Sequence, residues 1–352
     1  MKKNKLILGL TLAIAVMIAL TGCSGSEKTK KVTLNVYNWG DYIDESVLDD
    51  FTKETGINVS YETFNNNEEL LSKIESGATN YDVLFPSDYM VDIMAKKGLL
   101  SELDMSKIPN YKYIDERLKC LNYDKDEKYS VPYMWQTVGI CYNKEKVDPK
   151  KAESWDLLWD KNYAGQIIML DSPRDTIGTA LKKLGYSLNT TDDKQLEEAK
   201  KLLIAQKPLL NSYQVDYYKT ALIGEEALIS LAWSGDGMLI ASENPKYAYS
   251  IPKEGTNISI DCMVVPTQSE HKEAAMEFIN FMNKPEIAAR NADYIKYSSP
   301  NTEAIKLLPE EVQNNPYIYP KGSIDDIGEI FIDLGDYNKV YDKIWTEIKT
   351  AS

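Results

Sequence analysis

Histidine and cysteine are scarce in this 352-residue chain, and their scarcity excludes several kinds of chemistry. The only histidine, His271, begins a stretch rich in lysine and glutamate, so we expect it to be solvated. One histidine cannot build a histidine-based catalytic triad or a histidine-rich metal site. Three of the four cysteines, Cys120, Cys141 and Cys262, lie beyond the N-terminal region, and no CxxC spacing occurs. One disulfide among these three cysteines is possible, but we predict that they are buried free thiols.

An apolar run long enough to cross a membrane is also lacking. Leu6–Leu20 is largely apolar and follows three lysines, but its 15 residues fall short of the roughly 20 that a spanning helix needs. Residues 1–22 are therefore predicted to be an export signal. Leu20-Thr21-Gly22-Cys23 resembles the cleavage motif of bacterial lipoproteins, in which the cysteine is lipidated. The alternative is an ordinary signal peptide with a chance cysteine, and residues 24–31 read as a flexible tether.

Acidic residues outnumber basic ones, with 54 Asp and Glu against 40 Lys and Arg and a formal net charge of −14. Removal of the signal would take away three lysines and no acid. Such a chain is a poor nucleic-acid binder and attracts small cations, although acidity also serves solubility. The length predicts two domains with full cores. We find no internal repeat, low-complexity segment or coiled coil.

Strand and helix patterns alternate along the first part of the mature chain. Predicted strands cover residues 32–38, 57–64 and 81–85. Each is followed by a predicted helix, over residues 44–55, 68–77 and 89–97. This rhythm predicts a doubly wound parallel sheet with helices on both faces. The long extended segment 129–143 is interpreted as a crossover into a second lobe.

A second alternation follows this crossover. Its predicted strands are 166–170 and 227–233, and its predicted helices are 171–185, 193–205, 217–223 and 234–242. Strand 258–266 would carry the chain back, and the later helices, up to 336–349, would complete or brace the first lobe. We therefore predict an α/β fold with lobe 1 formed by 32–135 and 263–352 and lobe 2 by 136–262. Each lobe would hold a mostly parallel sheet, and two crossover strands would form a hinge.

Polar and aromatic residues gather where the predicted strands end, and open α/β sheets bind ligands at such places. Aromatic faces attract cations, and carboxylates make charge-assisted hydrogen bonds to ammonium groups. Aromatic walls also bury methylene chains. A slot of this kind suits a linear diamine or polyamine. The candidate residues are Trp39, Asp41, Tyr42, Ser87, Tyr89, Asp175, Trp233, Asp236, Asp261 and Tyr297.

Each candidate also has a purely structural interpretation. Ser87, Asp175 and Asp236 stand near predicted helix starts, where they would cap free N–H groups. The two tryptophans fit equally well as core residues at a sheet edge, and single tyrosines carry little weight because the chain has 24. Asp261 lies inside an apolar strand, where an unpaired charge is costly. It therefore carries the strongest single indication of a binding role.

Five motifs, in this order along the chain, resemble the spermidine/putrescine-binding protein family of polyamine ABC transporters: YNWGDY, PSDYMVD, DSPRD, WSGD and SIDCMVVP. The resemblance covers essentially the whole mature chain. It implies a two-lobed periplasmic-binding-protein fold of type II that closes on a polyamine and presents it to a membrane permease, without catalytic residues, cofactor or metal. It also implies that the ten candidates line the site, with Asp41 as in putrescine-selective members and Asp261 gripping an amine.

Three positions depart from the family pattern. Ser259 stands two residues before the strand aspartate, where the family usually has an aromatic residue that stacks on the ligand's methylenes. Ser172 stands where spermidine-binding members can have an acid, and Phe331 falls near a position where they can have glutamine. These departures leave the choice between spermidine and putrescine open.

The resemblance implies an exported monomer, lipid-anchored through Cys23 to the outer face of the cytoplasmic membrane, or on the periplasmic side if an outer membrane exists. One alternative keeps the fold but binds another cationic or zwitterionic amine or a metal chelate, as Ser259 would allow. Another is an extracellular hydrolase that uses paired carboxylates such as Asp236 and Asp261. A third is a structural or adhesive lipoprotein without a small ligand.

Overall fold

The structure is a computed structural model, and it describes residues 32–77 and 80–351. The predicted export signal, the lipidation site Cys23 and the tether lie outside the described residues. Within the described ranges, no helix combines the length and the apolar character that crossing a membrane requires.

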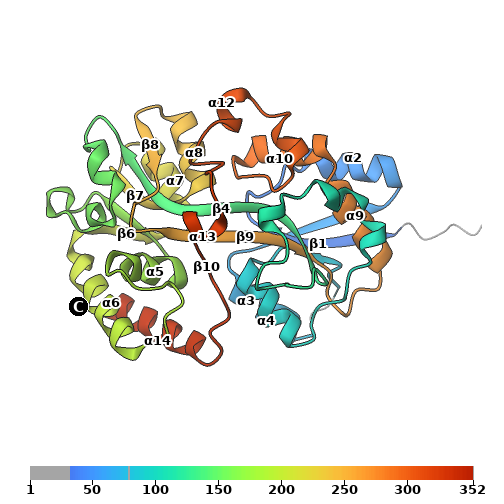
Figure 1. Cartoon of the computed structure of the whole chain (residues 1–352), viewed down its shortest axis with the longest axis horizontal. Coiled ribbons are helices and arrows are strands. Elements are labelled where there is room, and N and C mark those ends of the chain that lie inside the picture. Colours follow the sequence, from blue (N-terminus) through green and yellow to red (C-terminus); the bar gives the residue numbers. More distant parts are fainter. Residues whose placement is uncertain (1–31, 78–79, 352) are drawn as a thin grey trace, which may run out of the picture.

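Two long strands, β4 (Ser130–Asn143) and β9 (Thr256–Val264), run through the middle of the molecule and connect its two lobes (Figure 1). They pair antiparallel, with a register shift between Pro132 and Met134. Their side chains are buried almost throughout, because both strands lie inside the sheet and are covered on both faces. The prediction of a two-lobed α/β fold with two crossover strands is confirmed.

The first lobe is built on a three-stranded parallel unit. Strand β1 (Thr33–Trp39) lies between β2 (Asn58–Phe64) and β3 (Val83–Leu84), and β3 joins β9 antiparallel. Gly56, in the left-handed region at φ 75°, ends the first helix and turns the chain into β2. The helices that cover this unit are α2 (Ser46–Thr55), α3 (Asn67–Glu75), α4 (Asp88–Lys96) and α9 (Lys272–Met282).

The second lobe repeats the plan. Strand β5 (Ile167–Leu170) is parallel to β6 (Leu210–Gln214) and β7 (Ile229–Trp233), and β7 pairs antiparallel with β4. Every residue of β5 is buried, as expected of a strand covered on both faces. The helices of this lobe are α5 (Pro173–Lys183), α6 (Asp193–Gln206), α7 (Tyr217–Ile223) and α8 (Ser234–Glu243).

Three short strands were not predicted, namely β6, β8 (Tyr247–Ser250) and β10 (Gly328–Ile330). Strand β6 ends the path of neighbouring strands and is only partly buried, and β10 pairs with the start of β9. Strands β6 and β10 carry little hydrophobic periodicity because they are only partly buried, and β8 is mostly buried but has only four residues. They are added by pairing with strands that the pattern does reveal.

The last part of the chain crosses from one lobe to the other. Helices α10 (Pro285–Ile295), α11 (Thr302–Ile305), α12 (Glu310–Gln313) and α13 (Ile324–Ile327) precede β10 and the final helix α14 (Tyr337–Thr350). The final helix packs against α5 and α6 in one hydrophobic cluster. The prediction that it braces the first lobe is therefore wrong. The apolar face of α14 packs on α5 and α6 of the second lobe, and β10 leads the chain toward these helices (Figure 1).

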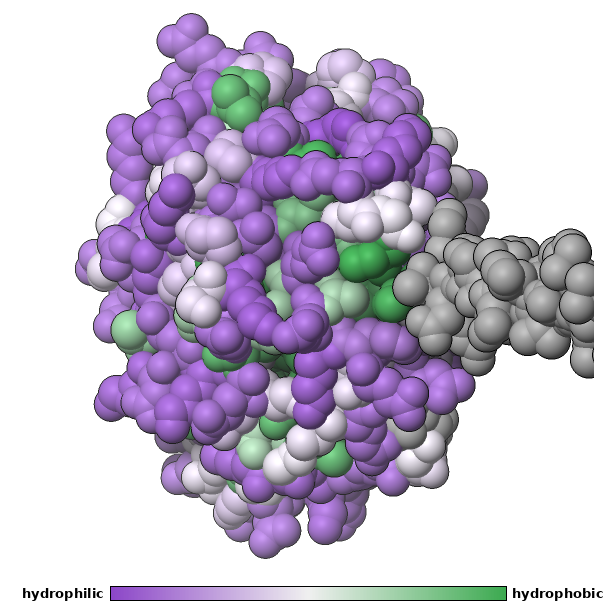
Figure 2. Space-filling model, turned by 90° about the vertical axis from the view of Figure 1, so that its right-hand side faces the viewer, coloured by the Kyte–Doolittle hydropathy of each residue, from purple (hydrophilic) through white to green (hydrophobic). Residues whose placement is uncertain are grey.

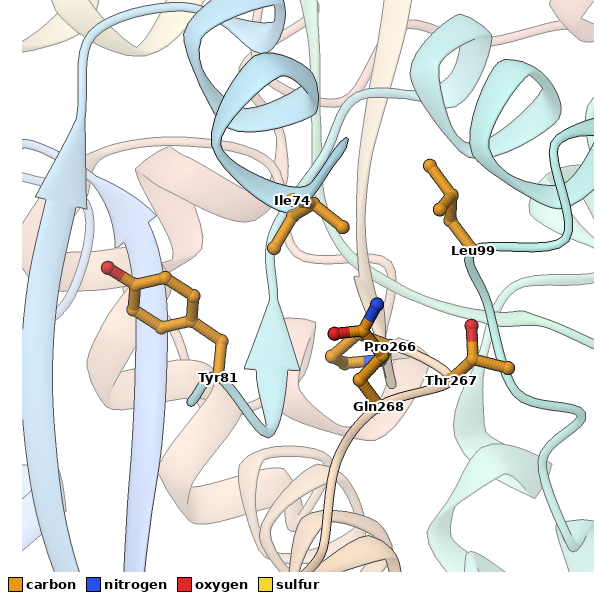
Figure 3. Close-up of a pocket in the computed structure, with 6 residues that line it drawn as sticks. All are labelled: Ile74, Tyr81, Leu99, Pro266, Thr267 and Gln268. Carbon is orange, nitrogen blue, oxygen red and sulfur yellow. The ribbon is translucent and has the colours of Figure 1, made fainter. Parts of the chain in front are cut away.

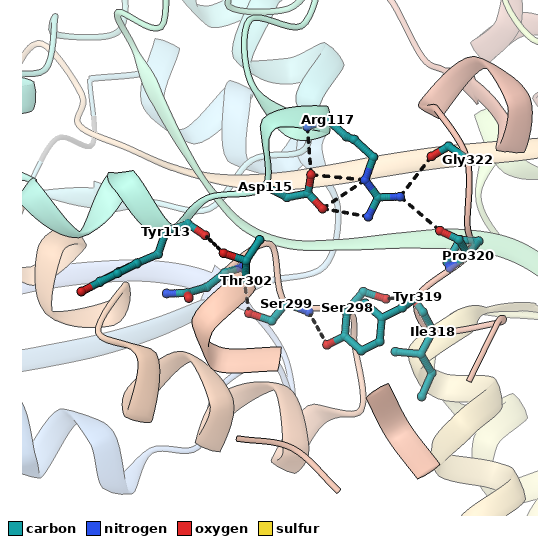
Figure 4. Close-up of polar contacts among 11 residues, drawn as sticks. Tyr113, Asp115, Arg117, Ser298, Ser299, Thr302, Ile318, Tyr319, Pro320 and Gly322 are labelled. Atoms are coloured by element: carbon teal, nitrogen blue, oxygen red, sulfur yellow. Dashed lines mark hydrogen bonds and ion pairs between the residues drawn. The ribbon is translucent and has the colours of Figure 1, made fainter. Parts of the chain in front are cut away.

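Arg117 fixes the path of this crossing segment. Its guanidinium donates to the carbonyl oxygens of Pro320 at 3.2 Å and Gly322 at 3.1 Å (Figure 4). The same guanidinium pairs with Asp115 at 2.8 Å. An arginine that holds backbone carbonyls on one side and a carboxylate on the other uses its fixed fork of donors.

The cysteines and the histidine differ in part from expectation. Cys120, Cys141 and Cys262 are free thiols, but only the last two are buried, whereas Cys120 is exposed. His271 is not simply solvated, because its Nδ1 lies 3.3 Å from the buried carboxylate of Asp82. Figure 2 shows that the face on the first-lobe side is mostly hydrophilic, with apolar residues in small areas between polar ones.

We expect the contact of α14 with the second lobe to contribute strongly to stability. Replacing the fully buried Ile348 by alanine should lower the free energy of unfolding by about 2–4 kcal/mol, because it removes buried methylenes and leaves a cavity. The matched control is Leu307→Ala at a 60% exposed position, which should change it by less than about 0.5 kcal/mol. Urea titration followed by circular dichroism measures both, and equal effects would contradict the packing described.

Candidate ligand-binding site

Asp261 lies at the centre of the candidate site, on β9 between the two lobes. It is 3% exposed and accepts hydrogen bonds from the Ser87 hydroxyl and the Tyr42 hydroxyl, each at 2.7 Å. Burial raises the pKa of Asp261 to about 6, against the opposing effect of these hydrogen bonds, and the charge of Asp175 raises it further. Both of its hydrogen-bond donors come from first-lobe segments, one after β1 and one before α4.

A second carboxylate, Asp236, joins the two lobes. It belongs to α8 of the second lobe and accepts a 3.0 Å hydrogen bond from the Tyr297 hydroxyl, which follows α10. Tyr218 of α7 donates to its other oxygen. The Tyr297 ring also meets the Tyr42 ring edge-on, with centroids 5.0 Å apart. Asp236 and Asp261 are thus linked through two tyrosines.

The close approach of Tyr297 to the second lobe depends on a glycine. A Cβ atom at Gly235 would overlap the Tyr297 ring. Tyr297 itself is placed by the next residue, because Ser298 forms a β-bridge with Trp135 of β4. The ring therefore stands against the start of α8 with no room for a larger residue.

Asp175 is the third buried carboxylate, in the first turn of α5. It accepts hydrogen bonds from the Ser172 hydroxyl at 2.7 Å, the Trp233 indole nitrogen at 3.3 Å and the Asn257 amide at 3.3 Å. Burial raises the pKa of Asp175, and these hydrogen bonds together with the charge of Arg174 lower it in part. Trp233 is the last residue of β7, so a strand end holds this carboxylate.

Tyr89 reaches the same region through polar contacts. Its hydroxyl accepts from the Asn67 amide at 3.1 Å and donates to Glu68 at 3.0 Å. The Asn67 amide also contacts the Ser87 hydroxyl at 3.1 Å. The chain Tyr89–Asn67–Ser87 therefore leads to Asp261, and its middle member is not among the candidates predicted from the sequence.

Trp39 and Asp41 lie at the margin of this network. The Trp39 indole nitrogen donates to the carbonyl of Phe85 at 2.8 Å, and its ring packs on Phe64. It is half-buried and packs against two hydrophobic clusters of the first lobe, one that includes Leu34 and one that includes Phe64. Asp41 has φ 49° and an 89% exposed side chain, 4.0 Å from Lys219 of the second lobe.

The capping interpretation does not describe the contacts of these residues. Ser87 is the N-cap residue of α4, but its side chain makes no capping hydrogen bond and donates to Asp261 instead. The carboxylates of Asp175 and Asp236 accept hydrogen bonds from side chains of other elements. Their side chains therefore form contacts between elements rather than capping the backbone N–H groups of their own helices.

The three departures from the family pattern also lie in this region. Ser259 is buried on β9 and pairs with Gln136 of β4. Ser172 binds Asp175, as described above. Phe331 is 4% exposed and lies under the Arg174 guanidinium, whose Cζ is 4.4 Å from the centroid of the Phe331 ring. An aromatic ring at this place holds a cation of the protein itself.

Several residues of the site were missed by sequence reasoning, and they are Asn67, Glu68, Tyr133, Arg174, Tyr218, Lys219 and Asn257. Apart from Arg174, they lie outside the quoted motifs. Asn67 and Glu68 follow β2 directly, so the strand-end rule that found the other candidates also applies to them. Tyr218 and Lys219 stand on a short helix and carry no such signal.

The site concentrates negative charge out of water. Among the described residues, none of Asp175, Asp236 and Asp261 forms an ion pair with a lysine or arginine within 4.0 Å. Their hydrogen-bond donors are neutral hydroxyl, indole and amide groups. Buried carboxylates with neutral partners attract a cation that brings its own hydrogen-bond donors, as an ammonium group does.

A depression elsewhere in the first lobe does not share this chemistry. It is lined by Ile74, Tyr81, Leu99, Pro266, Thr267 and Gln268 (Figure 3). It contains no carboxylate and none of the predicted candidates. The arrangement at Asp261 therefore remains the candidate site.

A cation-attracting site between two lobes that share two crossover strands defines a class, the two-lobed binding proteins of the periplasmic-binding-protein type. Comparison with known proteins agrees. The family model described as "Bacterial extracellular solute-binding protein" matches residues 46–320. The chain belongs to this family, and within it to the group that includes the spermidine/putrescine-binding periplasmic proteins.

Individual relatives match over nearly their whole length. The spermidine/putrescine-binding periplasmic protein of Salmonella typhimurium is 34% identical over 94% of this chain and 95% of its own. The solved structure of the spermidine/putrescine ABC transporter substrate-binding protein PotD from Streptococcus pneumoniae is 38% identical, with a TM-score of 0.81 over 91% of this chain and 99% of that one. A Listeria monocytogenes structure, provisionally named a spermidine/putrescine ABC transporter, is 41% identical, with a TM-score of 0.87 over 91% and 99%.

The raised pKa of Asp261 makes stability depend on pH. Between about pH 4 and 6 the folded chain holds a proton on Asp261 that the unfolded chain has lost, so the free energy of unfolding falls as pH rises through this window. The charged Asp261 carboxylate thus lowers the free energy of unfolding by up to about 3 kcal/mol at neutral pH, and Asp261→Asn removes this destabilisation. The variant should be more stable than the original chain at about pH 7 and similar to it at about pH 4.

Urea titrations at both pH values measure this difference. Asp49→Asn, at an exposed position, changes the formal charge equally and should alter stability by less than about 0.5 kcal/mol at either pH. A variant Asp261→Asn that is less stable at neutral pH would show that the carboxylate is stabilised, not strained, in the folded chain.

Proposed function

We propose that this chain is an extracytoplasmic solute-binding protein that captures a polyamine, spermidine or putrescine, between two closing lobes and delivers it to the permease of an ABC importer. The observation that carries the proposal is the group of three buried carboxylates, Asp175, Asp236 and Asp261, with tyrosines and Trp233 around them and neutral hydrogen-bond donors only. Relatives named for spermidine or putrescine support the choice of ligand. In this proposal the protein binds and releases its ligand and catalyses nothing.

Each lobe would contribute part of the binding energy. Tyr42 and Ser87 belong to the first lobe, Asp175 and Asp236 to the second, and Asp261 lies between them. A ligand held by both sets favours the closed state by its differential affinity. The bend would occur in β4 and β9, which gives lobe boundaries near residues 135/136 and 262/263.

The location follows from the same proposal. An exported chain, cleaved before Cys23 and anchored by a lipid on that cysteine, would remain at the outer side of the membrane beside its permease. The acidic surface would attract cationic ligands and disfavour nucleic acid. A shuttle that docks on a permease is expected to act as a monomer.

Calorimetric titration tests the ligand directly. The mature chain 24–352, unfolded and refolded to remove carried-over ligand, should bind spermidine or putrescine with micromolar or tighter affinity. Asp261→Asn should weaken binding by about a hundredfold, which corresponds to one charge-assisted interaction of about 3 kcal/mol. Asp49→Asn should bind like the original chain. If a folded sample bound neither spermidine nor putrescine detectably, the polyamine assignment would be refuted.

Closure of the lobes is tested at Gly235. Gly235→Ala places a methyl group where the Tyr297 ring lies, so the closed state should be disfavoured. Polyamine affinity should fall by about tenfold or more, and the ligand-induced decrease in the radius of gyration, measured by small-angle scattering, should shrink. Gly40→Ala is the matched control, because a Cβ there meets no atom within 4 Å. Equal closure in both variants would show that the Tyr297 contact is not part of the closed state.

A further inference from the structure

Lys219 stands between the two lobes beside the carboxylates of the candidate site. It belongs to α7 of the second lobe, and its Nζ lies 3.6 Å from Asp216 and 4.0 Å from Asp41, which follows β1 of the first lobe. The Lys219 side chain is only 16% exposed, whereas the side chains of Asp41 and Asp216 are 89% and 71% exposed. The ammonium group is thus held between the two lobes, with its side chain largely removed from solvent.

The surface ion pairs of Lys219 do not account for this position. Pairs with such exposed carboxylates contribute little to stability, because water screens them and ordering the side chains costs entropy. The neighbouring residue Tyr218 donates a hydrogen bond to the buried carboxylate of Asp236. Burial raises the pKa of Asp236, and the charge of Lys219 is the largest influence that lowers it again. Lys219 is thus the residue next to a direct hydrogen-bond partner of Asp236, on a helix that packs against α8.

We propose that Lys219 is a specificity-determining residue, whose fixed positive charge between the lobes, near Asp41 and next to the Tyr218 that binds Asp236, makes the site favour a diamine over a triamine. This inference rests on the proposed function, since it concerns polyamines in the same site. A ligand ammonium that approaches Asp236 meets the charge of Lys219. The repulsion grows with the number of charges that the ligand carries into the slot.

The opposite side of the site offers no relief for a longer ligand. Arg174 is 8% exposed and lies beside Asp175, whose pKa its charge lowers. It is enclosed by the rings of Tyr89, Phe331 and Tyr341, with Cζ 4.4–5.7 Å from their centroids. A triamine that shifts away from Lys219 therefore moves its extra charge toward a second buried cation. A diamine carries one charge fewer into this space.

The test compares spermidine with putrescine by calorimetric titration of the mature chain and of Lys219→Met, which keeps the length of the side chain but removes its charge. The variant should bind spermidine about tenfold more tightly and putrescine about threefold more tightly, so that the affinity ratio shifts toward the triamine. Lys219→Gln should shift the ratio in the same direction, and Lys219→Arg should preserve it, because the charge is retained.

Lys246→Met is the matched control. Lys246 forms an ordinary surface pair with Glu225, with both side chains more than 40% exposed, so its removal changes net charge equally but away from the site. It should leave the ratio unchanged. An unchanged ratio in Lys219→Met, or weaker binding of both amines, would overturn the inference while leaving the proposed function intact. If the original chain bound neither amine detectably, both the proposed function and this inference would be overturned.

Discussion

The energetic constraint on this molecule is the removal of three carboxylates from water without a directly paired cation. Asp175, Asp236 and Asp261 are buried, and burial raises the pKa of each. The surrounding hydroxyl, indole and amide groups lower this cost but do not neutralise the charge. A binding protein tolerates such a cost because the ligand that removes it then gains affinity, and the large cores of both lobes supply the stability that the site lacks.

In the proposed function, the same polar groups would couple ligand capture to lobe movement. Tyr297 reaches from the first lobe to Asp236 in the second, and Gly235 leaves room for its ring. Tyr42 connects Tyr297 to Asp261 by an edge-on contact and a hydrogen bond. Since both lobes contribute to one continuous network, a change at any carboxylate alters the contacts that hold the lobes together. Binding at this site and closure of the lobes would therefore be parts of one equilibrium.

The protein's own cations lie at the two sides of this network. Lys219 stands on the Asp236 side and Arg174 on the Asp175 side, whereas Asp261 between them has hydroxyl partners only. Arg174 rests on aromatic rings, including Phe331, in the way that a ligand cation would. In the proposed specificity, the positive charges of the protein, and not only its acids, would limit how many positive charges a bound ligand can carry.

Sequence alone determined the alternation of strands and helices, the two crossover strands and the family, because these depend on local periodicity and on motifs that survive as residue patterns. It also indicated Asp261, since a charge inside an apolar strand is visible without a structure. Edge strands such as β8 and β10, and the docking of α14 on the second lobe, came only from the tertiary structure. So did the positions of Asn67 and Lys219, as well as the margin positions of Trp39 and Asp41. These features depend on which surfaces meet after folding, and neither periodicity nor spacing records contacts between residues far apart in the chain.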